Sequence, residues 1–291
     1  MSVLEGTWTS EYITTNGITL HYVTEGNGPL MLMLHGFPEF WYSWRHQIPE
    51  FASDYKVVAL DLRGYNDSDK PQDLSAYNMR EFVQDVRGVI MGLGYDSCTL
   101  VAHDWGGAIA WNFAYAYPEM VEKLIVMNIP HPAKFVNGLW TIDQLQKSWY
   151  MFFFQLPLLP EIFLQADDYQ AIASSFIDMA IDKSAFTTTD LDVYKDAAAK
   201  RGALTAMINY YRNIFPAFFN LQERPQWGLL TVPTLMIWGE EDKALGKELT
   251  YGTEEYVQDF QIRYIPNCSH WVQQEKPELV NQYMREFLND N

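Results

Sequence analysis

The stretch CTLVAHDWGGAIAW, residues 98–111, decides the fold. Its apolar start, Cys98–Ala102, predicts a buried strand, and its end begins a helical pattern. Gly106 and Gly107 let the backbone bend tightly between the two elements. We therefore expect a strand, one sharp turn and a helix, with Asp104 held up at the end of a sheet strand.

Asp104 stands where serine hydrolases with such a turn carry their nucleophile. A carboxylate is already ionised at neutral pH, so it needs no base to activate it. It can attack an electrophilic sp3 carbon and form an ester. The expected chemistry therefore shifts from acyl transfer to catalysis through an alkyl ester, and the residue type argues against a serine or cysteine hydrolase.

Buried-strand and helical patterns alternate along the chain with short connections. This rhythm favours an α/β protein with a mostly parallel central sheet flanked by helices. A hairpin is expected around Asn16-Gly17. The other elements read from the pattern are strands at Pro29–Leu34, Lys56–Leu60, Leu124–Met127, Pro233–Trp238 and Gln261–Ile265, and helices at Met79–Met91 and Pro277–Leu288.

The rhythm stops after Asn128, where the sequence becomes aromatic and helical without a clear strand. We expect residues 131–226 to form a helical cap over the carboxyl edge of the sheet. Residues 1–130 and 227–291 would form the core domain. Ligand sites in such sheets lie at the carboxyl ends of the strands.

Two further polar residues follow predicted strands. Asp242 comes after the strand that ends at Trp238, and His270 comes after the strand that ends at Ile265. The order nucleophile, acid, histidine is that of the α/β-hydrolase fold. His270 would take a proton from the water that hydrolyses the ester on Asp104, and Asp242 would orient its ring.

The acid has neighbouring alternatives. Glu240 and Glu241 are also carboxylates, but the distance from Gly239 favours Asp242. Asn128 ends the other strand from which this fold can supply an acid, and an amide cannot do that work. Its presence strengthens the assignment of Asp242.

His35-Gly36-Phe37-Pro38 directly follows a predicted strand. A turn here would aim the Phe37 backbone N–H at the site. Together with the Trp105 N–H it would form an oxyanion hole. The residues predicted to contact substrate, with core packing as the alternative for the aromatic ones, are His35, Pro38, Phe152, Phe153 and Trp271.

Four stretches together resemble the α/β-hydrolase-fold epoxide hydrolases of the soluble type, over nearly the whole chain. The elbow alone is shared with the related haloalkane dehalogenases, whereas the Trp41–Arg45 run and the Pro-His-Pro step are more typical of epoxide hydrolases. The stretches are His35–Arg45, Arg63-Gly64-Tyr65, His103–Gly107 and Asn128–Pro132.

The resemblance implies two tyrosines in the cap that donate to the epoxide oxygen. Tyr150, ahead of Phe153-Phe154-Gln155, is similar to the first, and Tyr211, ahead of Arg212-Asn213, is similar to the second. Tyr210 is an alternative to Tyr211. Adjacent helical residues point about 100° apart, so only one of the two is expected to face the cleft.

The amino-acid composition limits the kinds of molecule that the protein is expected to bind. A net charge of −17 argues against nucleic acid and against an anionic membrane surface. The two cysteines, Cys98 and Cys268, and an N-terminus without signal-peptide features favour the cytoplasm. We expect a small, neutral, largely apolar substrate and water, no nucleic acid or membrane as a partner, no cofactor or metal, and a monomer or a homodimer.

Two other functions compete. A haloalkane or haloacid dehalogenase would use the same triad, but fluoroacetate-specific relatives need an Arg next to the nucleophile, where this chain has Trp105 and then Ala108. A non-catalytic ligand-binding protein on the same fold is the third reading. The intact triad argues against it.

Overall fold

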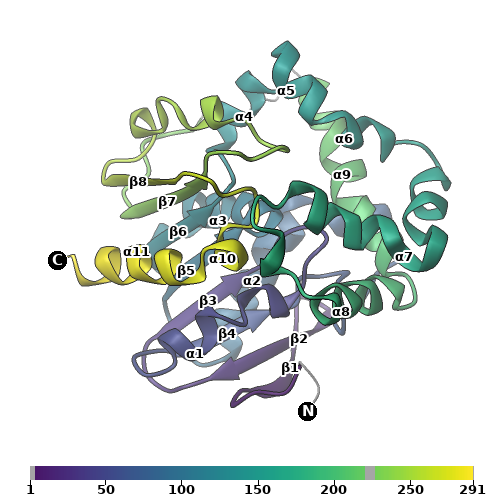
Figure 1. The fold of residues 1–291 in the computed structure, drawn as a ribbon. Helices are drawn as coiled ribbons and strands as arrows, with labels where there is room; N and C mark the ends of the chain where they lie inside the picture. Colours follow the sequence, from purple (N-terminus) through teal and green to yellow (C-terminus); the bar gives the residue numbers. More distant parts are fainter. Residues whose placement is uncertain (1–3, 220–226, 291) are drawn as a thin grey trace.

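The computed structural model describes residues 4–219 and 227–290. Its centre is an eight-stranded sheet in the order β1-β2-β4-β3-β5-β6-β7-β8 (Figure 1). From β4 through β8 the strands are parallel, whereas β1 and β2 pair antiparallel at one edge. The strands are β1 Thr9–Thr15, β2 Ile18–Glu25, β3 Leu30–Leu34, β4 Lys56–Leu60, β5 Cys98–His103, β6 Val121–Met127, β7 Thr234–Gly239 and β8 Phe260–Ile265.

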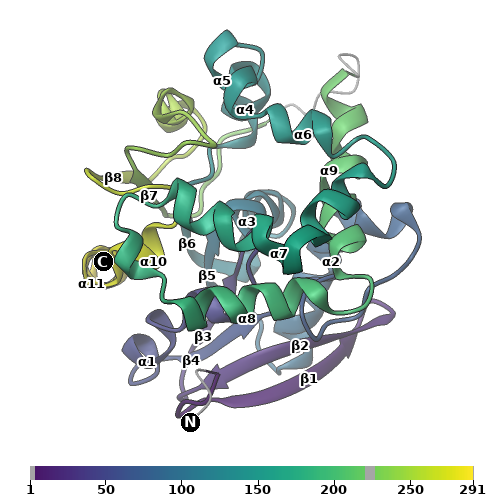
Figure 2. The same cartoon turned by 45° about the vertical axis from the view of Figure 1, so that its right-hand side comes forward.

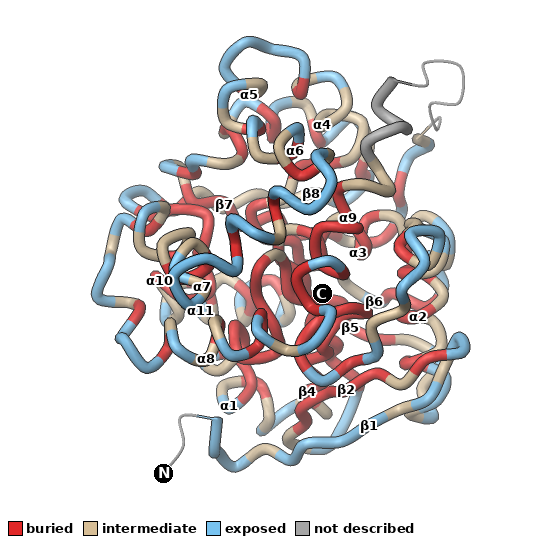
Figure 3. Tube along the Cα trace, turned by 90° about the vertical axis from the view of Figure 1, so that its right-hand side faces the viewer, coloured by how far each residue is buried: buried red, intermediate tan, exposed pale blue. Residues whose placement is uncertain are grey.

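The first two strands form the predicted hairpin. Asn16 and Gly17 connect them with φ values of 48° and 75°, which is the left-handed geometry of a tight two-residue turn. β1 is mostly exposed, while β5 is buried along its whole length (Figure 3). The other central strand, β3, is also buried throughout. Continuous apolar runs such as Leu30–Leu34 are what a strand covered on both faces requires.

Helices cover both faces of the sheet. α2 (Met79–Gly92) packs on α3 (Asp104–Ala116) on one face. On the other face, α1 (Gln47–Phe51) and α10 (Val272–Glu275) pack against α11 (Pro277–Asn289). The predicted α/β-hydrolase architecture, a mostly parallel sheet flanked by helices, is confirmed.

Between the end of β6 and residue 219, the regular elements of the chain are helices. Figure 2 shows these helices above the sheet edge that carries the carboxyl ends of the parallel strands. Residues 131–219 contain no strand. The helices are α4 Pro132–Gly138, α5 Ile142–Lys147, α6 Trp149–Phe153, α7 Leu159–Met179, α8 Thr188–Ala199 and α9 Ala203–Phe219.

The exact cap boundaries stay a prediction, and residue 226 lies outside the described residues. Within α7 the backbone leaves helical geometry at residues 166–169, so its first two turns run separately from the rest. In the part of the chain that the structure describes, no helix is long and apolar enough to cross a bilayer.

Candidate active site

Asp104 occupies the sharp turn between β5 and α3. Its φ of 47° lies in the left-handed region, which is strained for a residue with a side chain. The turn also presses against the loop after β3. A Cβ on Gly36 would come within 2.4 Å of the Asp104 Cβ, and a Cβ on Gly106 within 2.3 Å of the Leu34 carbonyl oxygen. Only glycine fits at these two positions, so the two glycines make the raised position of Asp104 possible.

The three predicted triad residues meet at the carboxyl ends of their strands. The His270 Nε2 lies 3.6 Å from the Asp104 Oδ2. The His270 Nδ1 lies 2.7 Å from the Asp242 Oδ2, within hydrogen-bond distance. The imidazole therefore stands between two carboxylates, one on each ring nitrogen.

Hydrogen bonds to both oxygens hold the Asp242 carboxylate in place. Its Oδ1 accepts hydrogen bonds from the Ala244 and Leu245 backbone N–H groups at 2.7 and 2.9 Å. Its Oδ2 also accepts a hydrogen bond from the Asn128 side-chain amide at 2.7 Å. The sequence only excluded Asn128 as the acid of the triad. In the structure, its side chain orients Asp242 from the end of the neighbouring strand β6.

These contacts fix the charges of the triad. Burial by itself raises the pKa of Asp242, but the His270 charge and the hydrogen bonds from His270 and Asn128 outweigh it and hold the pKa below its usual value. Burial likewise opposes ionisation of Asp104, but His270 and the Phe37 N–H keep the pKa of its carboxyl low. Burial lowers the pKa of His270, yet the two carboxylates raise it to about 10.

We expect Asp104→Asn to lower the pKa of His270, because one of the two negative charges that stabilise the imidazolium is lost. The check is a pH titration of the histidine ring protons by NMR, in which the His270 midpoint should fall below its value of about 10 in the unmodified protein. His131 serves as an internal control, since burial and Lys134 lower its pKa to about 3. An unchanged His270 midpoint would show that Asp104 does not set its charge.

The loop after β3 supplies the predicted backbone donor. The Phe37 N–H donates to the Asp104 Oδ1 at 2.8 Å. Trp105 lies in the first turn of α3, where backbone N–H groups lack an acceptor within the helix. The Phe37 N–H therefore reaches the nucleophile, and the Trp105 N–H belongs to the residue directly after it.

Behind the triad lies a buried pair that sequence reasoning missed. The Glu39 Oε2 is 2.7 Å from the His103 Nδ1 and accepts the Gly36 N–H at 2.9 Å. The other nitrogen of His103 lies 2.9 Å from the His270 carbonyl oxygen. Both ring nitrogens of His103 therefore lie within hydrogen-bond distance of an acceptor. The pair ties together the loops that carry Phe37, Asp104 and His270. Both residues lie inside the motif stretches His35–Arg45 and His103–Gly107, but nothing in the sequence pairs them.

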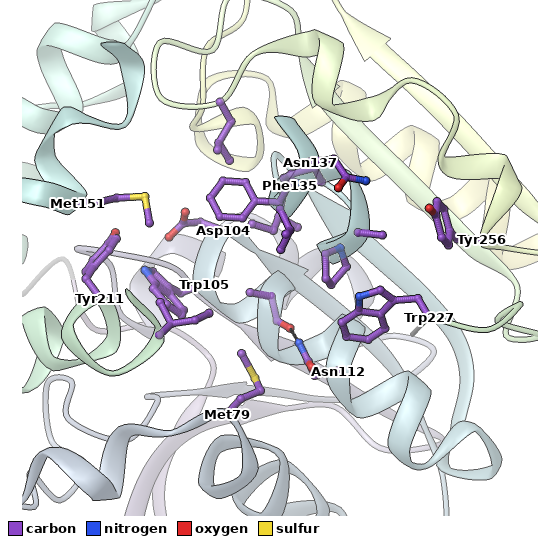
Figure 4. A pocket seen from close by; sticks show the side chains of 18 of the residues that line it. Met79, Asp104, Trp105, Asn112, Phe135, Asn137, Met151, Tyr211, Trp227 and Tyr256 are labelled. Atoms are coloured by element: carbon purple, nitrogen blue, oxygen red, sulfur yellow. Dashed lines mark hydrogen bonds between the residues drawn. The ribbon is translucent and has the colours of Figure 1, made fainter. Parts of the chain in front are cut away.

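Two cavities meet at Asp104. The larger, of about 590 Å3, extends toward Trp227 and Tyr256, and Figure 4 shows Trp105 and Tyr211 around it with Asp104. The smaller, of about 370 Å3, runs along the cap helices to Phe163. Asp104, Tyr150 and Tyr211 line both cavities.

The two cap tyrosines face each other across this junction. Tyr150 on α6 and Tyr211 on α9 have ring centroids 5.8 Å apart. Burial and the Asp104 charge raise the pKa of Tyr150, and burial, Tyr150 and Asp104 raise that of Tyr211. Both phenols therefore stay protonated and can donate.

Tyr210 points the other way. Its hydroxyl donates to the Arg63 carbonyl oxygen at 2.6 Å, and its ring stacks on Phe82 at 4.2 Å. It lines neither cavity. Of the two adjacent tyrosines, Tyr211 is therefore the one that faces the cleft.

The predicted substrate-contact residues divide into two groups. Pro38, Phe153 and Trp271 line the smaller cavity. His35 and Phe152 line neither cavity, which corrects their prediction. His35 is fully buried, and its ring nitrogens contact the Gly36 carbonyl oxygen and the Leu62 N–H. Phe152, on α6, is itself 38% exposed.

No group of three metal-ligating side chains occurs among residues 4–219 and 227–290. The larger cavity is lined mostly by apolar side chains. These apolar lining residues include Trp105, Ile129, Phe135, Met151 and Leu245. What the arrangement offers chemically is an ionised nucleophile, a histidine beside it and two phenol donors opposite, in an apolar enclosure.

Residues 29–277 match the family model of the alpha/beta hydrolase fold. The chain is 46% identical over 295 residues to Epoxide hydrolase 1 of Caenorhabditis elegans, covering 99% of this chain and 72% of that protein. It is 43% identical over 284 residues to Epoxide hydrolase 3 of Xenopus tropicalis, covering 95% and 76%. The crystal structure of the Bacillus megaterium epoxide hydrolase in complex with an inhibitor superposes with a TM-score of 0.91 at 43% identity, covering 96% of this chain and 100% of that one.

Proposed function

The chain belongs to the α/β-hydrolase-fold epoxide hydrolases, and on that premise we propose that it hydrolyses epoxides to vicinal diols through an ester on Asp104. One observation carries the proposal. Two protonated phenols, Tyr150 and Tyr211, line the same cavity junction as the ionised Asp104. An epoxide needs both partners at once: a nucleophile at carbon and an acid at the oxygen that leaves that carbon.

In the first step an Asp104 oxygen attacks an epoxide carbon, and the bond from that carbon to the ring oxygen breaks. The ring oxygen takes up negative charge and receives a proton from Tyr150 or Tyr211. The product is an ester between Asp104 and the alcohol, with a phenolate left in the cap. Since burial already raises the pKa of both phenols, this phenolate is a strong base that must be reprotonated before the next cycle.

In the second step the ester reacts with water. Esterification removes the charge on Asp104, so the pKa of His270 falls from about 10. The imidazolium then gives its proton to the phenolate. The neutral ring that remains can act as a base. His270 takes a proton from water, which attacks the ester carbonyl carbon. The Phe37 and Trp105 N–H groups would stabilise the oxyanion. When this intermediate collapses, the bond between the carbonyl carbon and the alcohol oxygen breaks, the alcohol oxygen takes the proton from His270, and the diol leaves. The new Asp104 carboxyl group then gives its proton to His270, which restores the carboxylate and the imidazolium.

The charge of His270 thus orders the two steps. While Asp104 is a free carboxylate, the imidazolium stabilises it and cannot take a proton. Once Asp104 is an ester, the neutral ring is the favoured form. Asp242, whose four hydrogen-bond donors keep it ionised, would compensate the positive charge that returns to His270 in the second step.

A substrate panel tests the reaction class. We expect diol from styrene oxide and from an aliphatic epoxide, and negligible fluoride from fluoroacetate. No arginine lines either cavity among the described residues, and Trp105 and Ala108 stand near the nucleophile where a carboxylate would need one. Diol is measured by chromatography and fluoride with an ion-selective electrode. Efficient fluoride release without epoxide turnover would move the chain to the dehalogenases.

A further inference from the structure

The outer side of the cap carries large apolar side chains that face solvent. We define the cap-tip patch as six residues of α6, the following loop and the start of α7, each 43% to 70% exposed: Trp149, Leu156, Leu158, Leu159, Ile162 and Phe163. Figure 1 draws this part of the chain at the rim of the cap, away from the sheet. Exposed apolar surface of this extent marks an interaction site rather than ordinary surface.

The patch is one surface held in a fixed shape. Phe153 contacts both Trp149 and Phe163, with ring centroids 6.1 and 5.7 Å away. Arg212 fixes the connecting loop by donating to the Phe154 and Leu156 carbonyl oxygens at 2.9 and 2.8 Å. The apolar groups are therefore preorganised for a partner.

The patch carries no net charge in a strongly acidic protein. Residues 148–165 contain a single ionisable acid or base apart from Tyr150, namely Glu161. Arg212 pairs with both oxygens of Glu161, at 2.7 and 3.1 Å. The charge that argues against an anionic membrane is thus absent from this face.

The groove beside Trp149, at the border of the cap-tip patch, is lined by equal numbers of positive and negative side chains. It is lined by Lys147 and Lys243 on one hand and by Asp143 and Glu248 on the other. Such a rim matches a surface that itself carries paired positive and negative groups. Two copies of a chain with a net charge of −17 repel each other, whereas a zwitterionic surface does not repel this chain.

The patch also continues into the active site. Trp149 and Phe163 belong both to it and to the lining of the smaller cavity, which reaches Asp104 and His270. A second protein copy seated here would cover that entrance, whereas a lipid surface would place apolar molecules at it. We propose that the cap-tip patch docks on zwitterionic lipid, and that apolar epoxides dissolved in the lipid enter through the smaller cavity. The entry route rests on the proposed function, but the docking does not.

The docking is tested by flotation with phosphatidylcholine vesicles. The variant Leu158→Asp/Ile162→Asp places two charges in the patch, and neither residue lines a cavity. Met91→Asp is the matched control, since Met91 is 53% exposed on α2 in the core domain. We expect the unmodified protein and the control to float with the vesicles, and the double variant to lose at least about tenfold in partitioning.

Turnover is measured in parallel on two epoxides. A water-soluble epoxide should react equally with all three proteins, while a long-chain epoxide dissolved in the vesicles should react about tenfold more slowly with the double variant. Failure of the unmodified protein to float would overturn the docking, as would a dimer in solution that the double variant converts to monomer. Flotation without turnover of either epoxide would instead overturn the proposed function and leave the docking supported.

Discussion

Replacing His270 with Gln is expected to stop the reaction after its first half. Asp104 should still open the epoxide, because a carboxylate needs no base, but the ester should hydrolyse slowly without one. Steady-state turnover should fall by about 10²–10⁴-fold, the range that general-base catalysis contributes. The intact mass of the variant should rise by the mass of one substrate molecule, and peptide mapping should place the addition on Asp104.

Asp104→Asn in the same background is the matched control. The amide has the same shape and can still accept the Phe37 N–H, but it is a poor nucleophile, so no adduct should form. Its measurement should be made before any deamidation restores the acid.

Oxygen labelling gives an independent readout on the unmodified enzyme. In a single turnover in ¹⁸O water with enzyme in excess, the new diol oxygen should come from Asp104, so the diol should be largely unlabelled. The label should appear in the Asp104 peptide, because water attacks the ester carbonyl carbon. A labelled first diol together with no adduct on His270→Gln would mean that water attacks the epoxide directly.

How far the sequence could lead depended on the range of the interactions involved. The turn at Asp104 was predictable because a buried strand, small residues and a helix follow each other within about a dozen residues, and the conformation is local. The approach of Asp242 and His270 was predictable from strand order, since the carboxyl ends of parallel strands share one edge. These features need no knowledge of side-chain packing.

Contacts across the fold were not predictable in this way. Asn128 was recognised as an unsuitable acid, but its hydrogen bond to Asp242 depends on the register of β6 against β7. The Glu39–His103 pair joins residues 64 positions apart that no periodicity links. His35 was expected to contact the substrate, whereas its ring is fully buried and its Nε2 accepts a hydrogen bond from the Leu62 backbone N–H.

The cap tyrosines lie between these cases. Helical geometry predicted that Tyr210 and Tyr211 face different sides. Which of them faces the cleft depends on the rotation of α9 against the core, and that rotation is set by packing such as the stacking of Tyr210 on Phe82.

Because Tyr210 and Tyr211 face different sides of α9, they allow the strongest test of which groups protonate the epoxide oxygen. We expect Tyr150→Phe/Tyr211→Phe to lose about 10²–10⁴-fold in epoxide turnover, because both hydroxyls that could protonate the ring oxygen are gone. The aromatic rings remain, so the contact of Tyr211 with Trp105 at 5.0 Å and the cap packing should persist. Each single variant should lose less than the double, since the remaining phenol still donates.

Tyr210→Phe is the matched control, one residue away on the same helix. It removes the hydrogen bond to the Arg63 carbonyl oxygen, so it should reduce the free energy of unfolding by about 1 kcal/mol while leaving turnover unchanged. Combining the double variant with His270→Gln separates the acid from the base. If the phenols act in ring opening, the triple variant should form the Asp104 adduct far more slowly than His270→Gln alone. If the folded triple variant and His270→Gln form the adduct at equal rates, Tyr150 and Tyr211 do not act in the first step. A loss of turnover in the double variant would then have to arise in ester hydrolysis.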